Sequence, residues 1–160
     1  MIYLKELTPK DVSKSYVKWM GDCEVHKFTS QKYKKNSLRD VTKYVKEKKN
    51  SKNEFLYGIF LQNNKKHIGN IKLGPINFVH KNANISYFIG NKNYWGKGYA
   101  TLAIEEVIKI AKKKGLKKLQ AYYHELNSAS KKVLKKNKFK FKSTQKSNTI
   151  FYDYLTDLVL

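Results

Sequence analysis

The sequence predicts a mixed α/β (α+β) domain in which a run of antiparallel strands precedes the longest helix. Short segments of alternating apolar residues indicate strands, and three of them follow one another without a helix between them. A doubly wound parallel sheet would instead alternate strand and helix throughout. The chain has 160 residues, 41 % of them hydrophobic. That is enough for one core, so we expect a single domain over residues 1–160.

The N-terminal part predicts one strand, one helix and a loop. Residues 2–7 alternate between apolar and polar side chains and form the first strand. Thr8, followed by a proline and then an acid, marks the start of a helix that ends near Gly21. A loop over residues 22–35 follows. The apolar residues expected on one face of this helix are Val12, Tyr16 and Trp19.

A second helix and the antiparallel run come next. Ser37 and Asp40 repeat the helix-start signal. The residues expected to point inward from this helix are Leu38, Val41, Tyr44 and Val45. Strands are predicted over 55–61, 67–73 and 83–90, with a tight turn at residues 63–64 and a longer connection over 74–82.

The C-terminal half predicts the best helix of the chain. Residues 98–114 carry a continuous apolar stripe, and Gly115 is a typical C-terminal stop. A fifth strand over 119–123 follows, and Asn127 is expected to cap a short helix that ends near residue 137. The last two strands are expected to pair as a hairpin, over 139–144 and 149–155.

The charge is the unusual feature of the composition. Lysine and arginine number 34 against 12 acids, a net charge of +22, and Arg39 is the sole arginine. A nucleic-acid-binding module is one hypothesis. The even spread of lysines and the single arginine argue against it, because base and phosphate recognition favours the arginine fork. A positive field would also attract an anionic small molecule.

The sequence predicts a cytoplasmic protein that needs no membrane and no metal. The N-terminus lacks the layout of a signal peptide, and no apolar run reaches the roughly 20 residues of a membrane helix. Cys23 is the single cysteine, so an intrachain disulfide is excluded. No group of histidines and acids has metal-ligand spacing. Both a monomer and a homodimer remain open.

A glycine loop between a strand and the long helix carries the clearest chemical signal. Asn93, Gly96 and Gly98 follow the strand that ends near Gly90. Glycines allow close approach of a ligand to the backbone, and the first amides of a helix can bind phosphate. Lys97 adds a cation. The spacing fits neither a Walker loop nor a dinucleotide fingerprint, and an ordinary tight turn is the alternative.

This unit resembles the acetyl-CoA site of the GNAT superfamily of N-acetyltransferases. The segment 95–101 is most similar to the branch with ribosomal-protein N-terminal and sugar-nucleotide amine acetyltransferases. The segment 19–25 and the pattern Asn127-x-x-Ser130, followed by Leu134 and Phe139, are similar to two further motifs of that branch. The resemblance implies a central, mostly antiparallel twisted sheet, flanked by helices and splayed between strands 4 and 5.

The resemblance also implies which residues bind acetyl-CoA. The amides of the loop, 96–100, would hold the pyrophosphate, and the strand backbone at 88–90 would pair with pantetheine like an extra strand. Asn127 would bond to the cofactor arm. The residues expected to contact the cofactor are Phe88, Ile89, Gly90, Trp95, Gly96, Lys97, Gly98, Tyr99, Ala100 and Asn127.

For the reaction, the resemblance implies direct attack of a neutral amine on the thioester. Leu134 stands where many relatives carry a tyrosine acid, so Ser130 is the expected proton donor to the thiolate. Tyr87 is expected to face the acetyl group. The candidate bases are Glu125, His26 and His124, with a water chain as the alternative.

The expected acceptor is a small, anionic molecule with a primary amine. Its candidate contacts lie in or after the first helix, at Trp19, Asp22, Glu24 and His26. An amino-sugar nucleotide is the first choice, because segment 19–25 is similar to that sub-branch. A protein N-terminus of the ribosomal type is the alternative, and a non-catalytic nucleic-acid-binding module is the hypothesis from another class.

Overall fold

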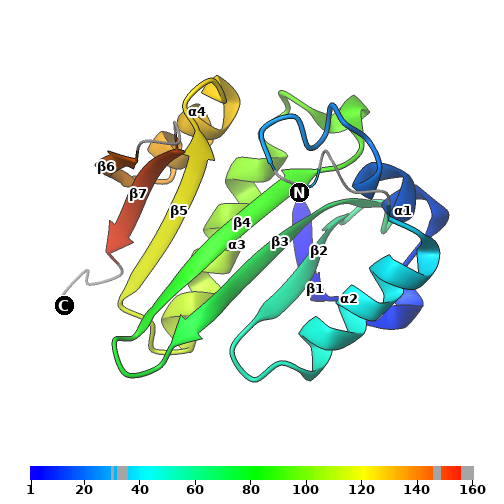
Figure 1. The fold of residues 1–160 in the computed structure, drawn as a ribbon, viewed down its shortest axis with the longest axis horizontal. Coiled ribbons are helices and arrows are strands. Elements are labelled where there is room, and N and C mark those ends of the chain that lie inside the picture. Colours follow the sequence, from blue (N-terminus) through cyan, green and yellow to red (C-terminus); the bar gives the residue numbers. More distant parts are fainter. Residues whose placement is uncertain (30, 32–35, 146–148, 156–160) are drawn as a thin grey trace.

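The computed structural model describes residues 1–29, 31, 36–145 and 149–155. In these residues the strands form one seven-stranded sheet in the order β1-β2-β3-β4-β5-β7-β6 (Figure 1). The strands are β1 (Ile2–Glu6), β2 (Phe55–Leu61), β3 (His67–Asn77), β4 (Asn82–Ile89), β5 (Lys118–His124), β6 (Lys140–Gln145) and β7 (Thr149–Leu155). The α-helices are α1 (Lys14–Met20), α2 (Leu38–Asn50), α3 (Tyr99–Lys113) and α4 (Ser128–Lys136). The predicted order of strands and helices is thereby confirmed.

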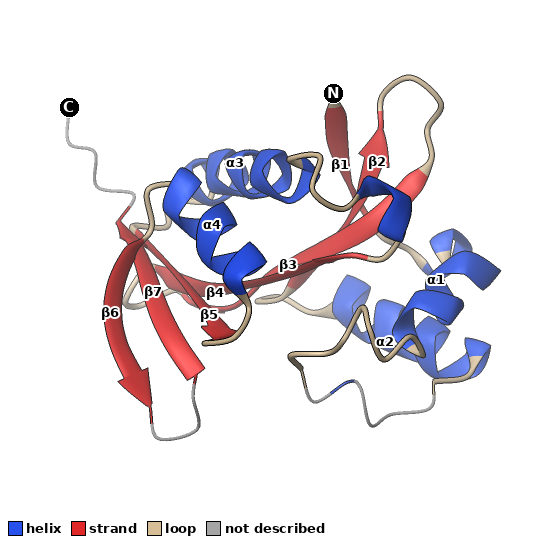
Figure 2. Cartoon of the chain, turned by 90° about the horizontal axis from the view of Figure 1, so that it is seen from above, coloured by secondary structure: helices blue, strands red, loops and turns tan. Residues whose placement is uncertain are grey.

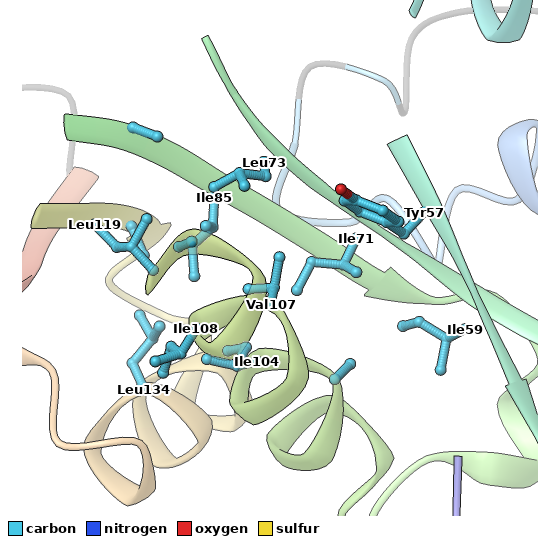
Figure 3. Close-up of a cluster of buried hydrophobic side chains, with 14 of the residues drawn as sticks. Tyr57, Ile59, Ile71, Leu73, Ile85, Ile104, Val107, Ile108, Leu119 and Leu134 are labelled. Carbon is cyan, nitrogen blue, oxygen red and sulfur yellow. The ribbon is translucent and has the colours of Figure 1, made fainter. Parts of the chain in front are cut away.

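Helices cover both faces of the sheet. Helices α3 and α4 lie on one face, and α1 and α2 lie on the other (Figure 2). The apolar stripe of α3 packs on the sheet in the larger core, where Ile104 and Val107 meet strand residues such as Ile71 and Ile85 (Figure 3). A smaller core under α1 and α2 contains Tyr16, Trp19, Val41 and Val45, among others.

The helix predicted from Thr8 is interrupted. A short 3-10 helix covers Pro9–Asp11, and Val12 then leaves helical geometry with φ −78° and ψ 102°. The α-helix starts after Ser13, whose hydroxyl accepts a hydrogen bond from the Tyr16 amide at 3.1 Å. The two successive start signals thus make two helices, because each cap fixes its own first turn.

The second helix begins at the predicted cap. Ser37 and Asp40 form a reciprocal capping box, with the Ser37 amide donating to the Asp40 carboxylate at 2.8 Å. The prediction that Leu38 points inward is wrong, because its side chain is 55 % exposed. It occupies the first position of the helix, whereas Val41 and Val45 lie on the buried side.

The predicted connection over 74–82 is too long. Strand β3 continues to Asn77, which pairs with Asn82 at the start of β4. The register shifts between Leu73 and Ile76, so the intervening Gly-Pro pair sits in a strand irregularity, a place where a proline is tolerated. Ile76 then returns to the core, which explains why pairing resumes.

Strands β4 and β5 form the one parallel pair among the described strand pairings. Their register ends at Ile85 opposite Ala121. Beyond this point both strands continue but diverge, as Figure 1 shows. The mostly antiparallel sheet with a splay between strands 4 and 5 agrees with the expected fold. The splay leaves an edge of β4 unpaired.

Candidate functional site

A pocket of about 1330 Å³ opens at the splay between β4 and β5. One half is lined by the loop after α1, by α2 and by the neighbouring residues of β3 and β4. The other half is lined by the glycine loop, the start of α3 and the exposed side of α4. We call the first the acceptor half, after the expected acetyl acceptor, and the second the donor half, after the expected acetyl donor. The fold thus joins segments that lie far apart in the sequence.

The start of α3, after the glycine loop, presents amides to the donor half that have no hydrogen-bond partner among the described residues. Gly96 and Gly98 have φ values of +72° and +81°, which favour glycine. Gly98 caps α3, and the first helical hydrogen bond runs from the Leu102 amide to the Gly98 carbonyl at 3.1 Å. The amides of Tyr99 and the two residues after it precede that bond and belong to pocket-lining residues. This arrangement fits a diphosphate.

Trp95 attaches this loop to β4. Its indole N–H donates to the Ile89 carbonyl at 2.7 Å. Tyr94 packs edge-on against Tyr99, with ring centroids 5.6 Å apart. Lys97 lies outside the described residues that line the pocket, and its ammonium stands 5.7 Å from the Tyr94 ring centroid. The phosphate contact expected of Lys97 stays a prediction.

The hydrogen bonds between β4 and β3 limit which backbone groups at 88–90 could pair with pantetheine. The Gly90 amide donates to the Ile68 carbonyl on β3 at 2.9 Å, so it faces away from the splay. Backbone groups of successive strand residues point to opposite edges. The backbone N–H and C=O groups of Tyr87 and Ile89 therefore face the splay, whereas those of Phe88 and Gly90 face β3. Gly90 is needed for packing instead, because a Cβ there would lie 2.2 Å from the Trp19 ring.

Tyr87 and Ser130 meet in the donor half. The Asn127 side chain caps α4 by accepting from the Ser130 amide at 3.0 Å, which fixes the first turn of that helix. The Tyr87 hydroxyl is buried and makes no hydrogen bond to the described residues. Burial raises the pKa of Tyr87 to about 12, and nearby Ser130 opposes this rise. Tyr87 is therefore a neutral phenol beside a second hydroxyl.

The acceptor half contains two buried polar side chains with a free nitrogen. His26 is 3 % exposed and Asn70 is 2 % exposed. Asn70 accepts at Oδ1 from His67 Nε2 at 2.7 Å, which directs its amide nitrogen elsewhere. Within the described part of the chain, neither Asn70 Nδ2 nor His26 Nε2 has a hydrogen-bond partner. Both residues line the pocket, so both can serve a ligand.

The other residues predicted to contact the acetyl acceptor lie in different surroundings. Trp19 is part of the smaller core and packs edge-on against His67, with centroids 5.2 Å apart. Asp22 accepts from the Glu24 amide at 2.9 Å and pairs with Lys92 at 2.9 Å, and these bonds lower its pKa. Glu24 also pairs with Lys92, and it lines the pocket. Trp19 and Asp22 shape the loop instead of lining the described pocket wall.

The remaining candidate bases lie elsewhere. Glu125 is exposed, and it is outside the described set of pocket-lining residues, as is His124. His124 instead stacks on Phe28 with ring centroids 5.7 Å apart, and its Nδ1 accepts from the Leu126 amide at 3.3 Å. Of the three titratable candidates, His26 is the one at the pocket.

Several pocket residues were missed by the sequence analysis. Lys132, Lys135 and Lys136 of α4 line the donor half. Their spacing puts them on one side of a helix, and this signal was available in the sequence. Asn70 and Lys72 line the acceptor half from β3, and no local pattern marks them.

Neither a metal site nor a membrane span is found in the part of the chain that the structure describes. The described histidines, cysteine and acids form no group of three that could hold a metal ion. Among the described helices, none is long and apolar enough to cross a membrane.

Comparisons with known proteins agree with this geometry. The family model for the acetyltransferase (GNAT) domain matches residues 2–140. The comparison with curated proteins gave no match. Among solved structures, the ribosomal L7/L12 alpha-N-protein acetyltransferase RimL with coenzyme A has a TM-score of 0.86 and 17 % identity, covering 98 % of this chain and 94 % of its own.

Two further structures are similar over nearly their full length. A GNAT-family acetyltransferase from Bacillus anthracis has a TM-score of 0.83 and 20 % identity, with 96 % of this chain and 94 % of that chain covered. A spermidine N-acetyltransferase from Vibrio cholerae, in complex with CoA and spermine, has a TM-score of 0.82 and 14 % identity, with 96 % and 95 % covered. At such identities the likeness shows a shared fold. Because the family model spans most of the sequence, the chain belongs to the GNAT acetyltransferase family, whose acetyl donor is acetyl-CoA.

Proposed function

We propose that this chain transfers the acetyl group of acetyl-CoA to a primary amine on an anionic small molecule, an amino-sugar nucleotide in the first instance. The whole chain, 1–160, would act as one domain in the cytoplasm, where acetyl-CoA is available. The observation that carries the acceptor class is the buried Asn70 Nδ2 donor in the acceptor half, which has no hydrogen-bond partner among the described residues. A hydrogen-bond donor suits an oxygen-rich molecule better than a polycation.

The donor half supports binding of the CoA phosphates. The unbonded amides at the start of α3 and the positive end of its dipole would hold the diphosphate. Lys132, Lys135 and Lys136 line the same half and add positive charge. They would offset the loss of the longer Gln or Arg side chain of related loops, where this chain has Asn93. The β4 edge at Tyr87 and Ile89 would pair with the pantetheine arm, with the Ile89 carbonyl already accepting from the Trp95 indole.

The acceptor half supports an oxygen-rich acceptor. Asn70 Nδ2 is a buried donor without a partner in the described structure, and leaving such a group unpaired costs free energy. A sugar hydroxyl or a phosphate oxygen would satisfy it. Lys72 is nearby on the same strand and pairs with Glu54 at 2.7 Å. Tyr16, Tyr44 and Phe28 supply aromatic surface to the same half.

The charges that line the pocket also favour an anionic acceptor. Five lysines and two acids line it in the described residues. Both acids are engaged, because Glu24 pairs with Lys92 and Asp40 accepts from Ser37. A positive field in a cleft attracts anions and repels polyamines.

In the reaction, the pocket would hold the amine against the thioester carbonyl, so that proximity supplies much of the rate. The backbone N–H groups of the open β4 edge would polarise that carbonyl. Ser130, beside the neutral Tyr87, would give a proton to the leaving thiolate.

A protein N-terminus is the second candidate acceptor. The likeness to the ribosomal-protein acetyltransferase RimL supports it through the fold alone. A nucleic-acid-binding module is disfavoured, because the chain has a single arginine and its lysines are spread along the whole sequence.

An acceptor panel tests the proposal. We expect CoA release to be fastest with nucleotide-linked amino sugars, slower with the same amino sugars without the nucleotide, and slowest with spermidine. Asn70→Asp should reduce kcat/KM for the nucleotide substrate, by about 10-fold, because it removes a donor and adds a like charge. Higher kcat/KM on N-terminal peptides than on every amino sugar would contradict the amino-sugar assignment and favour the second candidate.

A further inference from the structure

We propose that His26 is the base that accepts the proton of the attacking amine. The proposal rests on the proposed function and deepens it, since it concerns the acceptor half of the same pocket. It is carried by the position of His26 relative to β4 and by its unbonded ring nitrogen.

The groups that would carry out the two proton transfers lie on opposite faces of strand β4. Side chains of successive strand residues point to opposite faces. Tyr87 packs with the larger core on the α3 side, and Ser130 lies in the first turn of α4. Phe88 packs with the smaller core on the α1–α2 side. His26 contacts Phe88 edge-on, with ring centroids 5.1 Å apart. The proton donor and His26 therefore flank the splay from opposite faces.

The surroundings of the ring favour one tautomer. The Thr29 hydroxyl donates to the His26 carbonyl at 3.3 Å, so its oxygen can accept from Nδ1–H, which lies 3.5 Å away. With the proton assigned to Nδ1, the lone pair is on Nε2. Nε2 is buried and has no hydrogen-bond partner among the residues that the structure describes. An amine N–H in the pocket would supply that partner.

The charges around His26 suit a base that is neutral before the reaction. Burial lowers the pKa of His26, while the Asp22 carboxylate and the Trp19 carbonyl favour its protonated form. Asp22 is itself paired with Lys92. From β4 the contacting residue is the apolar Phe88. The ring is therefore unprotonated at neutral pH, yet two neighbours stabilise the cation that forms on proton uptake.

The reaction needs no further reactant, because each proton that is released has an acceptor. The amine nitrogen forms a bond to the acetyl carbon, and the bond from that carbon to sulfur breaks. The proton lost by the amine goes to His26 Nε2, and the thiolate takes a proton from Ser130. Solvent then removes the proton from His26 and restores that of Ser130, so the products are the acetamide and CoA thiol.

Other groups fit this role less well. Asn84 lies in the paired part of β4 opposite Gln120 and lines a different depression. Glu125 and His124 are outside the described wall of the main pocket.

The test compares His26→Gln with His80→Gln, a matched control at an exposed histidine between β3 and β4, outside the described wall of the pocket. With the best amine of the panel, we expect His26→Gln to lower kcat about 100-fold, a typical loss for general-base catalysis. Acetyl-CoA affinity should stay unchanged, and His80→Gln should behave like the wild type. In the wild type, kcat/KM should rise with pH through a pKa below 6.5. This rise of kcat/KM with pH, the acidic limb of the profile, should be lost in His26→Gln. Added imidazole should partly restore the activity of His26→Ala.

A second measurement uses the wild type alone and does not depend on how the variants fold. NMR titration of the His26 ring should give the same pKa as the acidic limb of kcat/KM. Full activity of His26→Gln, or a ring pKa that differs from that of the limb, would overturn the role of His26 and leave the proposed function intact. A wild type that binds acetyl-CoA but acetylates no amine would overturn both.

Discussion

Gly98→Glu is expected to weaken acetyl-CoA binding about 100-fold. Gly98 has a φ of +81° and begins α3, where its neighbours' free amides face the pocket. A carboxylate at this position would compete for the amides and repel the diphosphate. Losing about 3 kcal/mol of charge-assisted hydrogen bonding corresponds to a rise in Kd of about 100-fold. Calorimetric titration with acetyl-CoA measures this change.

The chain offers a matched control at the other end of the same helix. Gly115 has a φ of +71°, and a Cβ there would meet no atom within 4 Å, as is also true of Gly98. Gly115→Glu therefore introduces the same backbone strain and the same charge away from the pocket. It should lower the melting temperature at least as much as Gly98→Glu does, because a carboxylate is unfavourable at a helix C-terminus, while leaving Kd near the wild-type value. Equal loss of binding in both variants would refute the phosphate role of the loop.

The second large effect is expected on turnover. Ser130→Ala removes the hydroxyl beside Tyr87 while leaving the amide that Asn127 caps. The thiolate would then leave without a proton donor, so kcat should fall about 100-fold. Because the cofactor contacts are mainly backbone amides, the Kd for acetyl-CoA should change little. Steady-state kinetics and calorimetry on the same preparation separate the two quantities.

Ser128→Ala is the control for this substitution. Ser128 also lines the pocket on α4, but Ser130 is the serine that acts on Tyr87. Tyr87→Phe should show a smaller loss of kcat than Ser130→Ala, because the phenol is neutral, with its pKa raised to about 12, and makes no hydrogen bond to the described residues. If Ser130→Ala retains the wild-type kcat, Ser130 has no part in proton transfer.

Local signals made most of the fold predictable. The capping box at Ser37, the positive-φ position of Gly115 and the cap at Asn127 each lie next to the boundary they set. The errors arose where local signals were ambiguous. Ser13 was not identified as a separate cap, and the pair of Gly74 and Pro75 suggested a loop although β3 continues through it.

The donor half was more predictable than the acceptor half. The glycine loop and the start of α3 are contiguous in sequence, so residue order alone indicated an anion site. The acceptor half depends on β3 lying beside β4, which brings Asn70 opposite Phe88. It also depends on the loop after α1 reaching β4, where His26 meets Phe88. Such contacts between distant segments have no signature in a single sequence.

The central claim is that the start of α3 and the open edge of β4 hold acetyl-CoA. Amide chemical shifts of a ¹⁵N-labelled chain during titration with acetyl-CoA test it most directly. We predict saturable shifts that are largest at Tyr99, Ala100 and Thr101 and at the β4 residues Tyr87 and Ile89. Saturable binding whose largest shifts lie elsewhere, or no shift at millimolar acetyl-CoA, would contradict the account.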